Sequence, residues 1–321
     1  MRYKNVDSGK TVRRAAAVGL VALAALVIPA PVVSAGPPSS NGHDKVIQLP
    51  GASSAEGIAE GKGTTFFAGD LGKGDIFRGD IRRGTARLFI DVPDGWEAVG
   101  MKVDVDNDLL FVAGGSTGQG YVYDTDTRET VATYQLTAVS EQQPAFINDV
   151  AVTDDGAWFT NSLKGELYFV PVDRRGTPGD MKTLLLTGPA AATPAAFNLN
   201  GIAAVRGGRT LIVAHSANGA LYTVDPASGA SAAITGAKLP YVDGIVVKGN
   251  TLWAVQNMLN QVSRVRLDSG LESFEVRDVI TSPDFQVPTT AAVFGDTLAV
   301  VNAKFGVPGA STYEVVLVDA R

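Results

Sequence analysis

Four dipeptides at the start of a repeated strand pattern carry oxygen-bearing side chains that could bind a cation. They are Glu56-Gly57, Asn148-Asp149, Asn200-Gly201 and Asp243-Gly244, and each is followed by Ile or Val. If the repeats wrap around an axis, these side chains converge on one point from four directions. Carboxylate and amide oxygens are the donors that hard cations prefer. The pattern therefore predicts a shared cation site formed by Glu56, Asn148, Asn200 and Asp243.

The elements that must position these residues follow from the repeat itself. Six units begin near residues 56, 99, 148, 200, 243 and 289, with spacings between 43 and 52 residues. Short strands rich in Val, Ile, Thr, Phe and Tyr alternate with Gly-rich turns, and no long amphipathic helix interrupts them. A period of this length is typical of four-stranded propeller blades. We therefore predict an all-β fold, a six-bladed β-propeller.

Closure of such a ring needs a strand from the other end of the chain. The last unit offers only three strands, near Ala291, Thr297 and Tyr313. An open ring would leave sheet edges exposed. The segment Lys45 to Leu49 has the alternation expected of the missing strand, so we predict one propeller domain over residues 45–321, closed by an N-terminal strand.

The segment before the propeller has the features of an export signal. A basic stretch leads into an apolar run from Ala15 to Ile28, and Val33-Ser34-Ala35 suits a cleavage site. We predict a signal peptide over residues 1–35 and a flexible tail over residues 36–44, and hence a secreted, extracellular protein. An uncleaved anchor is the alternative, because the apolar run is short for a membrane span. The export route stays open.

Composition excludes several classes of function. Loss of the signal would remove five basic residues and Asp7, moving the net charge from -6 to about -10, which disfavours nucleic acid as a partner. The chain has no cysteine, so disulfides, thiol nucleophiles and thiolate metal sites are excluded. We expect a small-molecule substrate, no membrane partner after signal cleavage, and a monomer.

The chain resembles the senescence marker protein and gluconolactonase family of six-bladed propellers, whose relatives include diisopropyl fluorophosphatase, the paraoxonases and strictosidine synthase-like proteins. The resemblance covers roughly residues 45–319 at the level of the blade pattern. It implies a catalytic divalent metal at the top of the central channel, held by a Glu, two Asn and an Asp in that chain order. Glu56, Asn148, Asn200 and Asp243 preserve that order. With oxygen donors alone, Ca²⁺ is the preferred ion, and Mg²⁺ and Mn²⁺ are alternatives.

Two further groups of residues are expected near the metal. Antiparallel strands within a blade bring the end of the second strand to the face where the first begins. The corresponding polar residues are Asp70, Ser116, Asn161, His215, Asn257 and Asn302. Aromatic residues precede several unit starts, and they either wall an apolar cleft over the metal or pack between blades. These are Trp96, Phe146, Phe197 and Tyr241.

The resemblance implies a metal-dependent hydrolase of lactones or related esters, in which Asp243 activates water or attacks directly. His215 could serve as a base or a substrate clamp, or it could be a polar rim residue without a role. The only other histidine, His43, lies in the tail, so the histidine pair of the paraoxonases cannot form. A noncatalytic, calcium-bound extracellular propeller that binds a ligand or protein partner is the alternative. A lyase acting on a cyclic ester is a third possibility.

Overall fold

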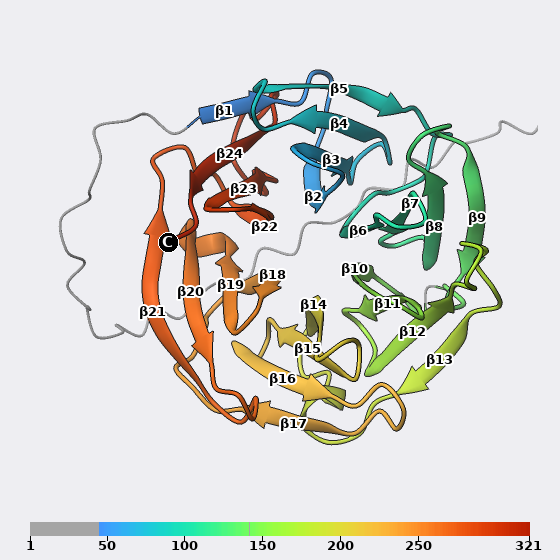
Figure 1. The fold of residues 1–321 in the computed structure, drawn as a ribbon, viewed down its shortest axis with the longest axis vertical. Helices are drawn as coiled ribbons and strands as arrows, with labels where there is room; N and C mark the ends of the chain where they lie inside the picture. The colour runs from blue at the N-terminus through green and yellow to red at the C-terminus, as the bar shows by residue number, and fades with distance from the viewer. Residues whose placement is uncertain (1–44, 141) are drawn as a thin grey trace, which may run out of the picture. The chain divides into compact units, whose positions relative to one another are not determined.

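The computed structural model describes residues 45–140 and 142–321. The predicted signal peptide (residues 1–35) and the predicted flexible tail (residues 36–44) lie outside the described residues. The described residues form six four-stranded antiparallel sheets. Figure 1 shows these sheets arranged as blades around a central axis, with the first strand of each blade innermost. The predicted all-β six-bladed propeller is confirmed.

The first three blades follow one another along the chain. The first blade consists of β2 (Ala55–Glu60), β3 (Thr65–Asp70), β4 (Ile76–Asp80) and β5 (Thr85–Ile90). The second consists of β6 (Met101–Asp104), β7 (Leu109–Ala113), β8 (Gln119–Asp124) and β9 (Thr130–Gln135). The third consists of β10 (Ile147–Thr153), β11 (Gly156–Asn161), β12 (Glu166–Pro171) and β13 (Lys182–Leu185).

The remaining three blades complete the ring. The fourth consists of β14 (Leu199–Val205), β15 (Thr210–His215), β16 (Ala220–Val224) and β17 (Ser231–Ile234). The fifth consists of β18 (Val242–Lys248), β19 (Thr251–Gln256), β20 (Gln261–Leu267) and β21 (Phe274–Thr281). The sixth consists of β22 (Pro288–Phe294), β23 (Thr297–Asn302), β24 (Glu314–Asp319) and β1 (Lys45–Gln48).

The helical segments of the described residues are short. They are the 3-10 turns η1 (Pro189–Ala191) and η2 (Asn257–Leu259). Over residues 45–140 and 142–321, no helix has the length and apolar character needed to cross a membrane.

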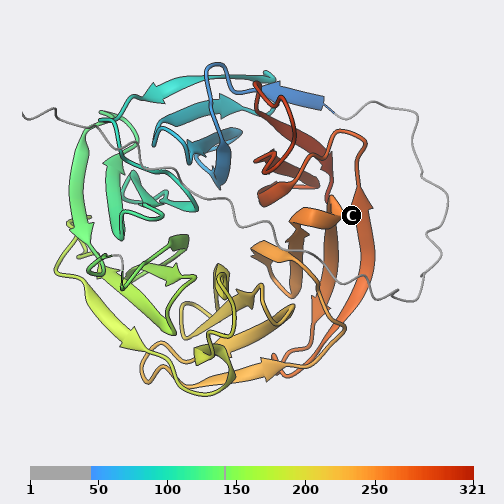
Figure 2. The same ribbon diagram turned by 180° about the vertical axis from the view of Figure 1, so that it is seen from behind.

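The two ends of the propeller meet in the sixth blade, as predicted. Strand β1 pairs antiparallel with β24, with Ile47 opposite Val315, and Figure 2 shows the blue first strand beside the red last strands. Ile47 is fully buried, so the pairing adds apolar contacts as well as backbone hydrogen bonds. The Lys45 ammonium donates to the carbonyls of Ile81 and Arg82 at 3.0 and 2.9 Å, which ties this strand to the first blade.

The hydrophobic core lies mainly between neighbouring blades. Phe111 of the second blade contacts Phe159 of the third edge to face, with ring centroids 6.4 Å apart. Phe67 of the first blade belongs to one buried cluster with Leu110 of the second. Because each blade buries its faces against the next, the ring holds its inner strands at fixed positions around the axis.

Candidate functional site

All four candidate residues lie in irregularities of the inner strands. The pairing register shifts between Ala55 and Ile58 in β2, and the corresponding shifts in β10, β14 and β18 enclose residues 148–149, 200–201 and 243–244. In each case two residues of the first strand oppose one residue of the second, which is a β-bulge. A bulge bends its strand and redirects a side chain. Each inner strand also contacts the inner strands of both neighbouring blades, so the bulges form a ring.

The glycines of these dipeptides let the inner strands approach closely. A Cβ atom on Gly201 would lie 2.5 Å from the backbone nitrogen of Ile245. A Cβ atom on Gly57 would clash with the carbonyl of Val99, and one on Gly244 would clash with Thr290. Only glycine fits such close backbone contacts. The second residue of each dipeptide therefore faces the next blade, and the first carries the candidate ligand.

Hydroxyl groups fix the orientation of both asparagine amides. Asn148 Nδ2 donates to Ser162 Oγ at 3.0 Å, and the Ser162 hydroxyl donates to the carbonyl of Leu199 at 2.6 Å. Asn200 Nδ2 and Ser216 Oγ repeat this arrangement, with the hydroxyl donating to the carbonyl of Val242. Each hydroxyl proton is already used on a carbonyl, so the serine can only accept from the amide NH₂ group. The amide oxygens therefore face away from the serines and are available to a ligand.

Asp243 is held by the residue after the second strand of its blade. Asn257 Nδ2 donates to Asp243 Oδ2 at 2.7 Å, and Asn257 Oδ1 accepts from the backbone N–H of Met258 at 2.6 Å. The second bond determines which way the Asn257 amide faces. Glu56 is anchored through its backbone, because the Thr289 hydroxyl donates to its carbonyl at 2.6 Å. Asp243 and Glu56 are only 5% and 6% exposed.

A third buried carboxylate, Asp149, occupies the position that is glycine in the other dipeptides. Its oxygens accept from the backbone N–H groups of Val150 at 2.8 Å and Ile202 at 3.1 Å. It thereby links the third blade to the fourth. Its dipeptide was one of the four candidates, but its carboxylate was not predicted to belong to the site, although the acidic residue at this position was the available signal.

Burial is the largest cause of a raised pKa at all three carboxylates. Burial raises the pKa of Glu56 well above its ordinary value, and the charges of Asp243 and Asp149 add to this rise. Burial raises the pKa of Asp243 to about 7, although hydrogen bonds from Asn257 and Asn200 oppose the rise. Burial also raises the pKa of Asp149 to about 6, against the opposing charge of Lys102. The charge of Asp149 thus acts on both Glu56 and Asp243, and the charge of Asp243 acts on Glu56.

Four of the polar residues expected around the channel mouth lie inside the blades instead. Asp70, Asn161, His215 and Asn302 are all fully buried. The Asp70 carboxylate accepts from the backbone N–H groups of Ser53 and Ser54 at 2.6 and 3.0 Å. Oxygens Oδ1 of Asn161 and Asn302 likewise accept from the backbone of the segments that enter their own blades. Successive residues point to opposite sides of the backbone, so Ser162 and Ser216, which follow Asn161 and His215, point away from the side chains buried inside the blades.

The side chains that contact the candidate asparagines lie one residue further along the chain than expected, and the sequence did not single them out. Ser162 and Ser216 directly follow Asn161 and His215, and they contact the candidate ligands. In the fifth blade the residue expected at the channel mouth, Asn257, is already the one that follows the end of the second strand, and it contacts Asp243. Within the described residues, the Ser116 side chain contacts none of the candidate ligands by a hydrogen bond, and its Oγ donates to the Glu97 carboxylate at 2.5 Å.

The His215 ring is enclosed by the fourth blade. Its Nε2 lies 2.8 Å from the carbonyl of Ala192, and its Nδ1 accepts from the backbone N–H of Asn218 at 3.3 Å. Its edge packs against Tyr222 with centroids 5.8 Å apart. Burial lowers the pKa of His215, which favours the neutral ring. With both nitrogens engaged and the side chain 0% exposed, this histidine is not presented to a ligand.

The four aromatic residues divide between the two expected roles. Trp96 stacks on Tyr121, with ring centroids 4.3 Å apart and an interplanar angle of 8°, and it packs against the apolar cluster between the first and second blades. Phe146 and Phe197 meet edge to face at 5.2 Å. Phe197 and Tyr241 are each 48% exposed. The Tyr241 carbonyl accepts from the backbone N–H of Asn257, so Tyr241 lies beside the residue that donates to Asp243.

Other features of the axis complete the description of the site. Within residues 45–140 and 142–321, no three His, Cys, Asp or Glu side chains lie together in a group that could hold a metal ion without other ligands. A cavity of about 670 Å³ lies toward the far ends of the inner strands, where Glu60 and Lys102 line it. The candidate ligands lie at the opposite ends of these strands.

Comparison with known proteins supports the fold alone. No family model and no curated protein sequence matches this chain. Among solved structures, luciferin-regenerating enzyme is similar with a TM-score of 0.61 and 14% identity, covering 84% of this chain and 92% of that one. The Malassezia sympodialis allergen Mala s 1 has a TM-score of 0.59 and 16% identity, covering 79% and 90%. A protein from Lactobacillus plantarum has a TM-score of 0.56 and 16% identity, covering 78% and 79%.

These neighbours include an enzyme and an allergen, so the six-bladed fold is shared by proteins with different functions. A fold of this kind does not specify a reaction. The resemblance stated from the sequence is supported as a distant likeness in fold, and the function has to be argued from the site.

Proposed function

We propose that this chain is a metal-dependent hydrolase of lactones or related esters, with one divalent cation at the axial end of the inner strands. The observation that carries the proposal is that the bulges of three inner strands bury the carboxylates Glu56, Asp149 and Asp243 and that the pKa of each is raised. Burying like charges together costs free energy unless protons or a cation neutralise them. A bound divalent cation would relieve this repulsion.

The donor set suits a hard cation. Glu56 and Asp243 would supply carboxylate oxygens, and Asn148 and Asn200 would supply the amide oxygens that face away from their serines. Oxygen donors of this kind favour Ca²⁺, with Mg²⁺ and Mn²⁺ as alternatives. Asp149 would act through its charge, because its oxygens are engaged by backbone N–H groups.

The chemistry would divide between the cation and the chain. When bound, such a cation polarises an ester carbonyl and stabilises the negative charge that develops during hydrolysis. Asp243 would accept a proton from the attacking water, since Asn257 holds only one of its two carboxylate oxygens. Exposed Phe197 and Tyr241 would offer apolar surface to the ligand. His215 has no part in this proposal because its nitrogens are engaged inside the fold.

The expected setting rests on the sequence. We propose that the protein is exported, acts as a monomer and takes a small-molecule substrate. The signal-like composition of residues 1–35 supports export.

The proposal is tested by calcium titration together with an activity screen. Saturating Ca²⁺ should raise the melting temperature, since a ligand at one hundred times its Kd adds about 2.7 kcal/mol. Glu56→Gln should lose most of this increment. Glu60→Gln, on the same strand but at its other end, is the matched control and should keep it. An equal calcium increment in Glu56→Gln and in the unmodified chain would remove Glu56 from the site.

Activity separates the hydrolase from the noncatalytic alternative. Aliphatic lactones, aromatic lactones and aryl esters should be turned over only with added metal, and turnover should disappear with chelator and in Asp243→Ala. Calcium stabilisation without turnover across this panel would favour a calcium-bound propeller that binds a ligand or protein partner.

A further inference from the structure

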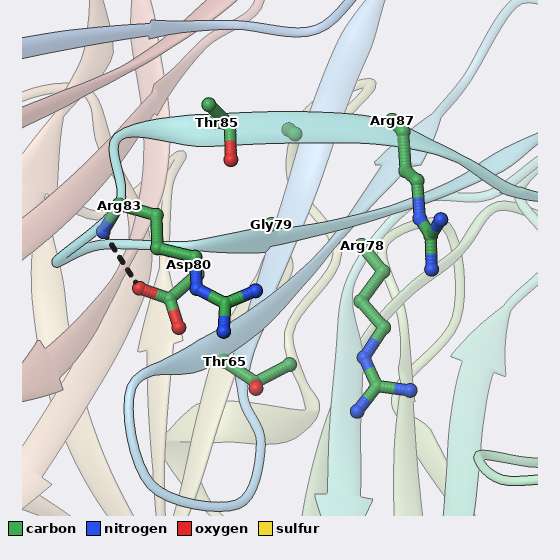
Figure 3. Close-up of a pocket in the computed structure, with 8 residues that line it drawn as sticks. Thr65, Arg78, Gly79, Asp80, Arg83, Thr85 and Arg87 are labelled. Carbon is green, nitrogen blue, oxygen red and sulfur yellow. Dashed lines mark hydrogen bonds between the residues drawn. The ribbon is translucent and has the colours of Figure 1, made fainter.

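A basic pocket lies on the outer strands of the first blade, away from the axis. It has a volume of about 670 Å³ and is lined by Arg78, Arg83 and Arg87 together with Thr65, Thr85 and small residues. Figure 3 shows Arg78 and Arg87 extending in the same direction from neighbouring strands, with Arg83 beside Asp80. We refer to these residues as the arginine pocket.

Two of its arginines form an unfavourable pair. Arg78 of β4 and Arg87 of β5 are directly opposite in the antiparallel ladder. Like charges at directly opposed positions destabilise a sheet. An overall excess of basic residues does not explain this pairing, since the whole chain has a net charge of -6. An anion bound between the two guanidinium groups would turn this local repulsion into attraction.

The carboxylate that lines the pocket is engaged chiefly by backbone and hydroxyl donors, and the charge of Arg83 adds a smaller contribution. Asp80 accepts from the backbone N–H groups of Arg82 and Arg83 at 2.9 and 2.8 Å, and from the Thr64 hydroxyl at 2.8 Å. These bonds, chiefly the one from the Arg83 backbone, lower the pKa of Asp80. Its role is to hold the turn between β4 and β5. Within the described part of the chain, none of the three pocket arginines forms an ion pair.

One guanidinium group is already held in place. The Arg78 Cζ atom lies 5.6 Å from the ring centroid of Phe67 and 5.4 Å from that of Phe89. Its NH1 atom lies 3.5 Å from the carbonyl of Thr125 in the second blade. A guanidinium fixed on aromatic faces loses less side-chain entropy when it binds a ligand.

We propose that the arginine pocket binds the phosphate group of a small phosphate ester. Guanidinium groups present paired N–H donors that match the oxygens of a phosphate. The hydroxyls of Thr65 and Thr85 add further donors along the same wall. This inference does not depend on the proposed hydrolase.

The test is isothermal titration of the full chain with inorganic pyrophosphate, in chelator so that no divalent cation mediates the contact. Arg83→Gln and Arg87→Gln should each weaken binding by about tenfold, the loss expected for a hydrogen bond between charged groups. Arg174→Gln, an exposed arginine of the third blade, is the matched control and should bind normally. Arg78 is left unchanged because its side chain packs on aromatic rings.

Folding is monitored separately by thermal melting. Removing one member of the opposed pair in Arg87→Gln should leave the melting temperature unchanged or raise it. Pyrophosphate binding that is equal in both pocket variants and the unmodified chain would overturn the proposal. It would also be overturned if the chain bound phosphatidylglycerol vesicles but not pyrophosphate, because that outcome indicates a membrane surface as the partner.

Discussion

The buried Asp243 carboxylate should make the cation-free protein less stable as the pH rises, and Asp243→Asn should remove that effect. The folded protein keeps a proton on Asp243 up to a pH of about 7, whereas the unfolded chain releases it near 3.8. Between these values the folded state binds more protons, so the free energy of unfolding falls with rising pH. The stabilising contribution of the proton is complete below about pH 4 and is lost above about pH 7.

The expected magnitude follows from the same pKa change. One pKa unit corresponds to about 1.4 kcal/mol, so the rise from 3.8 to about 7 amounts to about 4 kcal/mol between pH 4 and pH 8. An asparagine at this position carries no charge at either pH. In chelator, Asp243→Asn should therefore be more stable than the unmodified chain at pH 8 by up to about 4 kcal/mol, and similar to it at pH 4.

The assay is urea unfolding in chelator at several pH values between 4 and 8, followed by fluorescence. Asp70→Asn is the matched control, since Asp70 is also a fully buried aspartate. Its carboxylate accepts from Ser53, Ser54 and Gly72, and an amide cannot accept all of these bonds. Asp70→Asn should thus destabilise the protein by about 1–3 kcal/mol at pH 8, the opposite sign to Asp243→Asn.

Two results would refute this reasoning. One is a cation-free protein whose stability does not fall between pH 4 and pH 8. The other is an Asp243→Asn variant that is less stable than the unmodified chain at pH 8, which would mean that the carboxylate contributes favourable contacts in the absence of a cation.

Three further predictions concern the framework of the site. Ser216→Ala should leave folding nearly intact but weaken calcium affinity by about tenfold, measured by titration, because Asn200 loses the acceptor that orients its amide; equal affinities would contradict this role. Gly244→Ala should cost about 1–3 kcal/mol of unfolding free energy, because the new Cβ would clash with Thr290, and unchanged urea unfolding would be inconsistent with the close contact. A chain that begins after Gln48 should aggregate in size-exclusion chromatography, because it exposes the edge of β24, whereas one that begins at residue 43 should stay soluble.

The sequence alone was sufficient to predict the architecture and the positions of the candidate ligands. The repeat period predicted the six blades, and the missing strand of the last unit predicted the pairing of β1 with β24. These features could be predicted because they depend on short strand segments and turn residues that are visible locally in the sequence. The four dipeptides were also recognisable, since each stands at the start of the repeated strand pattern. Whether they bind a cation remains a prediction.

The tertiary structure decided which neighbouring side chains meet the candidate ligands. A difference of one residue along a strand moves a side chain to the opposite face, so Asn161 and His215 point into the blades while Ser162 and Ser216 reach the asparagine amides. The convergence of Asp149 with the other carboxylates likewise depends on the bulges and on glycine contacts between blades. Asp149 is 93 positions from Glu56 and 94 positions from Asp243 in the chain, so no local pattern encodes their interaction, and it becomes fixed only when the blades pack around the axis.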